Sequence, residues 1–297
     1  MLELVKTNKY ELTKWIDYKT NKISYMDQSS WYNPKNEYKI SLPLDEMDKK
    51  LNEKIRKFKT LEDYFPGKSL RTCCALTGRT EDFIVDKDKE TKNLIFPYIE
   101  GSKGIPKKFS KPLAYNYIEY DYDLQIKISD EFKSELEKLG VKNKKRVTLG
   151  DKEIYVAPKI FIRQSSMNIM CTYTEDNYAA NNSIYVLSSK KYDENSKKML
   201  KYVCGLLNSN LITYYARINN IIRYGIGKTP QIKISDFKTI RIVVNNEYYD
   251  EIIELVEKLL ENKNCNENLK KLNHFVYKIY DISNEEIVHI ENTILKA

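Results

Sequence analysis

Residues 157–187 read APKIFIRQSSMNIMCTYTEDNYAANNSIYVL. Near its start, three apolar residues at 160–162 stand between two cations, Lys159 and Arg163. An apolar run without alternation is typical of a strand buried on both faces, with charges emerging only at its ends. An Asn- and Tyr-rich segment then leads to a second apolar run at residues 184–187. We therefore expect a rigid strand pair that presents polar side chains at one end.

Positive charge is concentrated in the middle of the chain. The net charge is +8, and residues 67–246 hold 31 Lys and Arg against 20 Asp and Glu. Residues 247–297 hold 6 against 11 and are therefore acidic. This distribution favours a polyanion as partner, although a solvated basic surface has the same composition. The 24 tyrosines suit base stacking and wet interfaces, but the codon bias of an AT-rich genome gives the same count.

The cysteines and histidines do not form a ligand pattern. Five cysteines include no Cys-x-x-Cys pair, and the two histidines are His274 and His289. We expect no metal site and no disulfide framework. The first residues, MLELVK, lack the apolar core of a signal peptide, and no apolar run is long enough to span a bilayer. These features predict a cytoplasmic protein that does not contact membranes.

The pattern of apolar residues predicts a mixed α/β (α+β) fold with a C-terminal helical unit. We expect an N-terminal connector at 1–60 with one helix at about 47–58, a central domain at 61–245, and the helical unit at 246–297. In the helical unit, Ser283 and Glu286 form a capping-box pattern.

Three further expectations concern local structure in the central domain. Ser196 is expected to cap a helix that Asn208-Ser209-Asn210 separates from the next one at 211–218. Residues 232–234 and 240–244 are expected to be strands. The alternating pair Asp121 and Asp123 is expected on an exposed strand face.

No motif in the chain indicates a catalytic centre. The segment GIGKT at 225–229 lacks the first glycine of a phosphate loop, because Ile222 stands there, and Pro230 prevents the helix that would follow. A Gly-rich loop with Arg223, Tyr224 and Lys228 suits contact with a nucleic-acid backbone, and a plain connecting loop fits as well. Asn33-Pro34 is followed by Lys35, so it lacks the second proline and the aromatic residue of the amino-methyltransferase loop. No nucleophile has a base partner in an elbow motif.

Several motifs resemble one family in the expected order. The segments TLEDYFPGKSLRTCCALTGRTEDFIV and NLIFPYIEGSKGIPKKF are followed by PKIFIRQSS, YAANNSIYVL, YVCGLLNSNLITYY and TPQIKISDFKTIRIVV. Over residues 61–290 they resemble the C-terminal specificity region of TaqI-like adenine methyltransferases, and the tail FVYKIYDISNEEIVHIE resembles the helix-turn-helix that closes such chains. The last strand departs from the family pattern, which has a Pro-Ile-Pro-like element there.

The resemblance implies a DNA target-recognition domain of an adenine-N6 methyltransferase or a restriction-modification enzyme. The methyltransferase half is not recognised, so S-adenosylmethionine is expected on a partner methyltransferase domain or subunit, encoded separately or missing by truncation, and this chain is expected to hold no cofactor. Double-stranded DNA is the expected ligand. The alternatives are an enzyme remnant that binds DNA without sequence preference and a stand-alone nuclease.

The candidate DNA-binding residues are cations, amides and one tyrosine. Arginine suits guanine, whereas glutamine and asparagine suit adenine, and lysines suit phosphates. The candidates are Arg79, Lys107, Lys108, Lys144, Lys145, Arg146, Lys159, Arg163, Gln164, Asn181, Asn182, Arg223, Tyr224 and Lys228.

Overall fold

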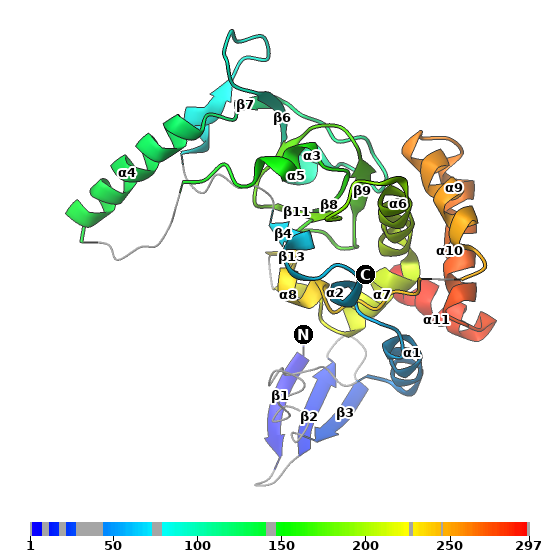
Figure 1. The fold of residues 1–297 in the computed structure, drawn as a ribbon. Helices are drawn as coiled ribbons and strands as arrows, with labels where there is room; N and C mark the ends of the chain where they lie inside the picture. The colour runs from blue at the N-terminus through cyan, green and yellow to red at the C-terminus, as the bar shows by residue number, and fades with distance from the viewer. Residues whose placement is uncertain are drawn as a thin grey trace.

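The structure is a computed structural model that describes residues 2–7, 12–17, 22–27, 44–72, 79–140, 147–225, 228–244 and 246–295. Helices and small, mainly antiparallel sheets alternate along the chain, which confirms the mixed α/β class (Figure 1).

The central sheet contains the strand pair that the opening stretch predicts. Its order is β4 (Leu70–Thr72), β11 (Ile184–Ser188), β8 (Lys159–Arg163) and β9 (Cys171–Thr174). Strands β8 and β11 are antiparallel, with Arg163 opposite Ile184 and Lys159 opposite Ser188. Both strands are buried along almost their whole length. The pair therefore has an Arg163 end and a Lys159 end.

A second sheet packs beside the first. Its order is β10 (Ala179–Ala180), β6 (Ile95–Ile99), β7 (Asn116–Glu119) and β5 (Ile84–Val85). Two short helices lie near it, α3 (Gly101–Gly104) and α5 (Lys152–Val156). Phe161 of β8 is fully buried in the core of this second sheet, whereas its neighbours Ile160 and Ile162 face the larger core. Burial on both faces explains why β8 shows no alternation.

The helix α4 (Tyr122–Lys138) corrects the expectation of an exposed strand around Asp121 and Asp123. The Asp121 carboxylate accepts a hydrogen bond from the backbone N–H of Leu124 at 2.9 Å and so caps the helix. Asp123 lies in the first turn, where a negative charge is favourable. The helix projects from the body of the molecule (Figure 1).

Helices cover the other face of the central sheet. They are α6 (Glu194–Asn208) and α7 (Asn210–Ile218), followed outward by α9 (Tyr249–Leu260), α10 (Cys265–Ile279) and α11 (Asn284–Leu295). Helix α6 lies between the sheet and α9 (Figure 1). A Cβ on Gly205 would lie only 2.9 Å from Cγ2 of Val256, so glycine allows the two helices to approach closely.

The caps of these helices follow from short polar side chains. Asp193, not Ser196, caps α6, because its Oδ1 accepts the backbone N–H of Ser196 at 2.8 Å. Ser209 ends α6 and caps α7, as the interruption predicts. The Ser283 and Glu286 capping box is confirmed, with hydrogen bonds of 2.8 and 3.3 Å in the two directions.

The N-terminal region forms more structure than a connector. Residues 2–27 contain an antiparallel sheet of β1 (Leu2–Thr7), β2 (Leu12–Asp17) and β3 (Lys22–Asp27). After it come α1 (Glu46–Arg56), α2 (Leu61–Tyr64) and the 3-10 turns η3 (Gly67–Ser69) and η4 (Thr80–Phe83). Leu51 and Ile55 of α1 are buried in the same core as the tail helices. The domain boundaries at 60 and 245 stay predictions.

A two-stranded ribbon precedes the tail helices. It consists of β12 (Ile222–Gly225) and β13 (Lys228–Ile232), and α8 (Ile234–Phe237) follows. The expected strand at 232–234 is therefore wrong, because the strand ends at Ile232. The expected strand at 240–244 is also wrong, since this segment forms only an isolated bridge from Arg241 to Thr60. Its Ile240 and Ile242 are buried, but no neighbouring strand extends the pairing.

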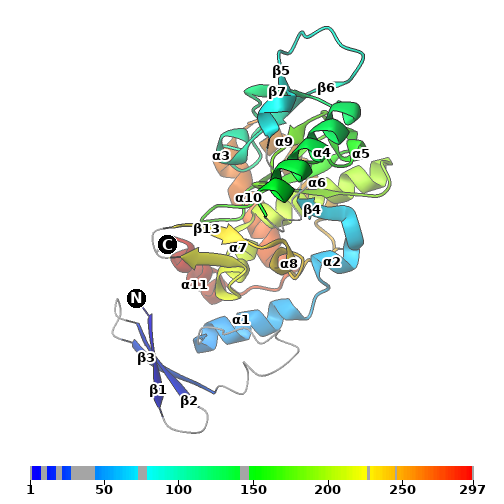
Figure 2. The same cartoon turned by 90° about the vertical axis from the view of Figure 1, so that its left-hand side faces the viewer.

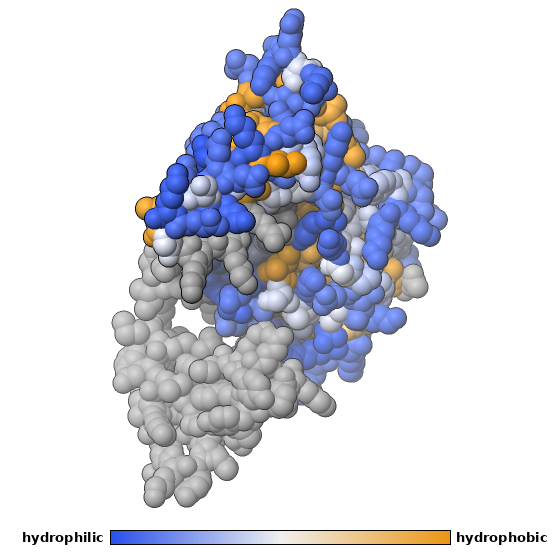
Figure 3. All heavy atoms as spheres, turned by 60° about the vertical axis from the view of Figure 1, so that its left-hand side comes forward, coloured by the Kyte–Doolittle hydropathy of each residue, from blue (hydrophilic) through white to orange (hydrophobic). Residues whose placement is uncertain are grey.

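The described residues on the face seen in Figure 3 are mainly hydrophilic. In the view of Figure 3, hydrophobic residues form small areas separated by hydrophilic ones among the residues that are described. Within the described ranges, no helix combines the length and the apolar character needed to cross a membrane. Scattered apolar residues of this kind are normal on a protein surface.

A buried carboxylate fixes the loop between β5 and β6. Glu119 is 5% exposed and accepts hydrogen bonds from Lys89 Nζ at 2.6 Å, from the Thr91 hydroxyl and from Asn93 Nδ2 at 2.9 Å. The hydrogen bonds with Lys89 and Thr91 are the main cause that lowers the pKa of Glu119 from about 4.5 to about 2. The loop is thus held by an ionised group.

We predict an acid dependence of stability that originates at Glu119. Because the pKa is lower in the folded protein, the contribution of Glu119 is complete above about pH 4.5 and is lost as the pH falls toward about 2. Urea unfolding of wild type and Glu119→Gln should differ most at neutral pH, and the difference should shrink across this interval. Glu153→Gln, at an exposed position on α5, is the control. A difference that does not change with pH would contradict the assignment.

Candidate nucleic-acid interface

The ribbon joins the Arg163 end of the central sheet through backbone hydrogen bonds. The Gln164 carbonyl accepts the N–H of Ile232 at 2.9 Å, and the N–H of Ser166 donates to the Pro230 carbonyl at 3.1 Å. An isolated bridge pairs Ser165 with Gln231. Strand β13 is therefore bonded along both edges, to β12 on one side and to residues 164–166 on the other. Figure 2 shows the ribbon beside α7 and α8.

Gln164 supports this junction with its side chain as well. Its Nε2 donates to the Tyr185 hydroxyl at 3.1 Å, and this hydroxyl donates to the Ile232 carbonyl at 2.8 Å. Tyr185 is 2% exposed, and burial raises its pKa, so the hydroxyl keeps its proton. The amide that sequence analysis assigned to a base edge thus lies against the inside of the junction.

The turn before β11 meets the same end of the sheet. The backbone N–H of Gln164 donates to the Ser183 carbonyl at 2.9 Å. Asn181 Oδ1 accepts the N–H of Ser183 at 3.2 Å, so this side chain shapes the turn. Asn182 is exposed. The structure therefore brings Gln164, residues 181–183 and the ribbon together, although they are far apart in sequence.

Arg163 and Arg223 lie at this end, each against a partner within the chain. Arg163 Nη1 lies 3.2 Å from Met170 Sδ, and burial lowers the pKa of this guanidinium. Arg223 Nε donates to Asp236 Oδ2 at 3.0 Å, and its Nη2 contacts the same oxygen. Asp236 is 4% exposed, so the pair ties β12 to α8. The backbones of Tyr224 and Lys228 lie in the ribbon, but their side chains are outside the described part.

The expectation that charged side chains emerge at both ends of β8 is wrong for Lys159. It is 0% exposed, and its Nζ donates to the carbonyls of Tyr155, Ala157 and Asp176 at 3.1, 2.7 and 3.0 Å. A buried ammonium is tolerated when its donors are satisfied in this way. In this structure Lys159 cannot reach a DNA phosphate.

The other predicted phosphate contacts lie apart from the ribbon. Lys107 Nζ donates to Asn262 Oδ1 at 2.9 Å, and Lys108 Nζ to the Asn208 carbonyl at 2.7 Å, at the end of α6. Burial lowers the pKa of Lys108 to about 8. Arg79 Nε contacts Asp82 at 2.9 Å. Lys144, Lys145 and Arg146 lie outside the described residues. The DNA contacts of these side chains stay predictions.

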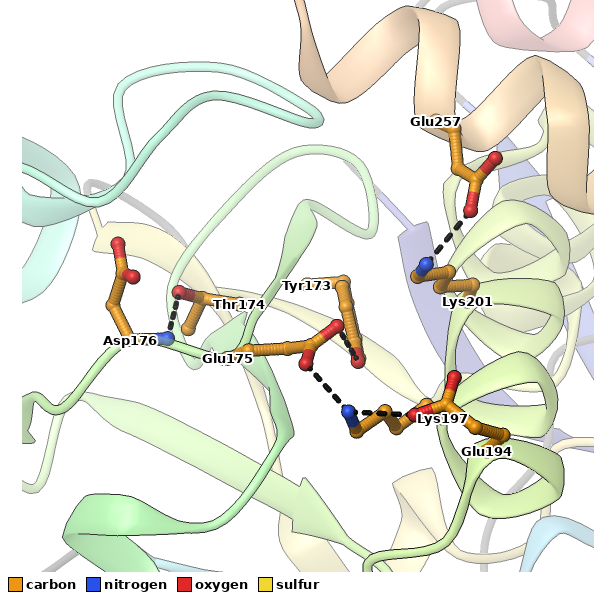
Figure 4. A network of polar contacts seen from close by, with 8 residues as sticks. All are labelled: Tyr173, Thr174, Glu175, Asp176, Glu194, Lys197, Lys201 and Glu257. Atoms are coloured by element: carbon orange, nitrogen blue, oxygen red, sulfur yellow. Dashed lines mark hydrogen bonds and ion pairs between the residues drawn. The ribbon is translucent and has the colours of Figure 1, made fainter.

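The Lys159 end of the sheet is closed by ion pairs (Figure 4). Lys197 Nζ lies 3.0 Å from Glu175 and 2.9 Å from Glu194, while Lys201 Nζ lies 2.7 Å from Glu257. The Tyr173 hydroxyl donates a hydrogen bond to Glu175 Oε1 at 3.0 Å. Both lysines shown are thus neutralised within the protein.

A group with metal-ligating residue types lies between α1 and α11. Atoms of Asp45, Asp48 and His289 lie within 4.8 Å of one another. Each of these side chains has a protein partner: Asp45 caps the N–H of Asp48 at 2.8 Å, and His289 Nε2 contacts Asp48 Oδ1 at 2.8 Å. The Tyr214 hydroxyl also donates to Asp48. These hydrogen bonds link α1, α7 and α11.

The exposed side of β13 was not predicted from the sequence. Thr229, Gln231 and Lys233 are exposed, whereas Pro230 and Ile232 between them are buried. This alternation is the ordinary pattern of a strand with one wet face. The alternation is present in the sequence. It was not recognised because residues 225–229 were assigned to a loop and residues 232–234 to a separate strand.

We predict that Tyr185→Phe loosens the ribbon. The substitution removes one donor to the Ile232 carbonyl and one acceptor for Gln164, and should lower the free energy of unfolding by about 1–3 kcal/mol. Hydrogen exchange should rise at Ile232 before it rises in β8. The exposed Tyr115→Phe is the matched control. Unchanged exchange at Ile232 would show that the hydroxyl does not hold the ribbon.

We predict that Lys108 acts on stability rather than as a free phosphate contact. Its pKa is about 8 in the folded protein and near 10.5 ordinarily, so between these values the unfolded chain binds more protons. Wild type should therefore gain stability relative to Lys108→Met as the pH rises from about 8 to about 10.5. Chemical unfolding at several pH values measures this. A constant difference, combined with weaker DNA binding by the variant, would favour the phosphate role.

Comparisons with known proteins give a family and a distant structural likeness. Residues 107–242 match the model of the TaqI-like C-terminal specificity domain. Among solved structures, the chain is similar to the type IIL restriction-modification enzyme MmeI in complex with DNA, with 13% identity and a TM-score of 0.45. The similarity covers 76% of this chain and 35% of that one, so this chain spans about a third of its length. Comparison with curated proteins gave no match.

The family match covers a narrower range than the resemblance at 61–290, and it contains β8, β11 and the whole ribbon. Residues 107–242 thus match a TaqI-like C-terminal specificity domain, which is the family that the motifs resemble.

Proposed function

We propose that this chain supplies the DNA sequence specificity of a restriction-modification enzyme that methylates adenine at N6. The observation that carries the proposal is the specificity-domain match over residues 107–242. Methyl transfer and the binding of S-adenosylmethionine are assigned to a methyltransferase domain or subunit that acts on the same double-stranded DNA.

The geometry of the Arg163 end supports this function. Reading a base sequence requires side chains that are held rigidly, because a loosely held donor matches several bases equally well. At this end, β13 is bonded on both edges and its carbonyl at residue 232 is held by Tyr185. The exposed groups there are hydroxyl, amide and ammonium groups, which are the types that contact base edges and phosphates.

The charge distribution supports a polyanionic ligand. Residues 67–246, which include the matched region, hold 11 more basic than acidic residues, whereas the tail helices are acidic. Phosphate contacts release counterions, and each contributes roughly 0.9 to the slope of log affinity against log salt for duplex DNA.

We predict that the protein enriches a defined motif from a library of random DNA duplexes. The expected result is one recurrent site whose affinity falls steeply with salt, measured by sequencing of bound DNA and by fluorescence anisotropy. A scrambled duplex of the same length and composition is the control. Salt-dependent binding without any enriched motif would support the alternative of a remnant with nonspecific affinity, and a flat salt dependence would remove the DNA-binding proposal.

A further inference from the structure

We infer that the exposed face of β13 is the base-reading surface of this chain, with Gln231 as the residue that determines specificity at one adenine. This inference rests on the proposed function and adds the element, the residue and the groove through which it operates. Two of the residues predicted at this end, Gln164 and Arg223, are positioning residues that hold β13 in place.

The first support is the direction in which the side chains point. Pro230 and Ile232 face the interior, and Ile232 is 0% exposed. Thr229 and Gln231 of β13, and Lys233 directly after the strand, therefore lie on the opposite side, which is accessible to solvent or a ligand. Lys233 forms no ion pair with any described residue, in contrast to Lys197 and Lys201 at the other end of the sheet.

The second support is rigidity. The backbone at residue 231 is paired with Arg223 across the ribbon and with Ser165 on the other edge. Arg223 is itself fixed to the buried Asp236, and the adjacent carbonyl of Ile232 accepts the Tyr185 hydroxyl. A side chain on so constrained a backbone loses little further freedom when it binds.

The third support is shape. Strands of a β-ribbon or β-sheet can contact bases in the major groove of B-DNA, which is about 12 Å wide. Alternate side chains on a strand are about 6.6 Å apart, which corresponds to roughly two base steps of about 3.4 Å. Thr229 and Gln231 should therefore reach base pairs about two steps apart, while Lys233 reaches a phosphate.

Chemistry then selects the base for Gln231. Its amide offers a donor and an acceptor side by side, which match N7 and N6 of adenine in the major groove. Lys233 has only donors and no planar fork, so it suits a phosphate and carries no base identity.

The experiment compares motif selection and affinity for wild type, Gln231→Ala and Lys233→Ala. Gln231→Ala should bind the cognate duplex about 5- to 150-fold more weakly, the loss of one bidentate pair, and should accept any base at one position. Lys233→Ala should weaken all duplexes alike and reduce the salt slope by about 0.9. Lys198→Ala, at an exposed position on α6, is the control and should change neither.

A second variant separates base reading from a structural role. Gln231→Glu keeps an acceptor and removes the donor, so the position should shift from adenine toward cytosine, whose N4 amino group donates. A loss of fold cannot produce such a shift. Thr229→Ala should alter a position about two base pairs away.

The outcomes distinguish the two levels of the proposal. If wild type enriches a motif and Gln231→Ala and Gln231→Glu enrich the same one, the assignment of β13 is overturned and the proposed function stands. If wild type enriches no motif, both fail. Equal melting temperatures of the variants confirm that the comparison concerns binding.

Discussion

The double pairing of β13 is the constraint on which the Arg163 end depends. A two-stranded ribbon by itself is only marginally stable in water. Here the second edge is bonded to residues 164–166, and the Tyr185 hydroxyl, which lies inside the sheet, holds the Ile232 carbonyl. The buried strand pair β8–β11 thus transfers its rigidity to an exposed element. For this reason, the polar side chain of Gln164 in the opening stretch forms its hydrogen bond at the junction and does not point into solvent.

Buried cations show the same priority of internal satisfaction. An ammonium that leaves water loses its hydration, so acceptors within the protein must replace that shell. Lys159 has three carbonyl acceptors, and Lys108 has the carbonyl at the end of α6, where a helix presents its partial negative charge. The middle region therefore contains more basic residues than it exposes at its surface. Charge counts locate a polyanion-binding region but do not identify the contacts.

The sequence was sufficient to predict the break at Ser209, the tail helices and the capping box at Ser283, because each depends on neighbours within a few residues. The buried strand pair was predictable from its two unbroken apolar runs. The sequence was also sufficient for the specificity domain through motif order. The directions of Gln164 and Arg223 were not predictable, since their partners, Tyr185 and Asp236, are 21 and 13 residues away. Residues 240–244 have a strand-like pattern, but a strand also requires a free edge nearby.

The two ends of the central sheet show why local rigidity and availability must coincide for recognition. At the Lys159 end, Lys197 and Lys201 are held in place, but both form ion pairs within the protein. Their partners are Glu175, Glu194 and Glu257. At the Arg163 end, fixation is achieved mainly by backbone hydrogen bonds and the Arg223–Asp236 pair, which leaves the outward side chains of β13 uncommitted. Backbone pairing does not depend on side-chain identity. The outward residues can therefore change without loss of the element that carries them.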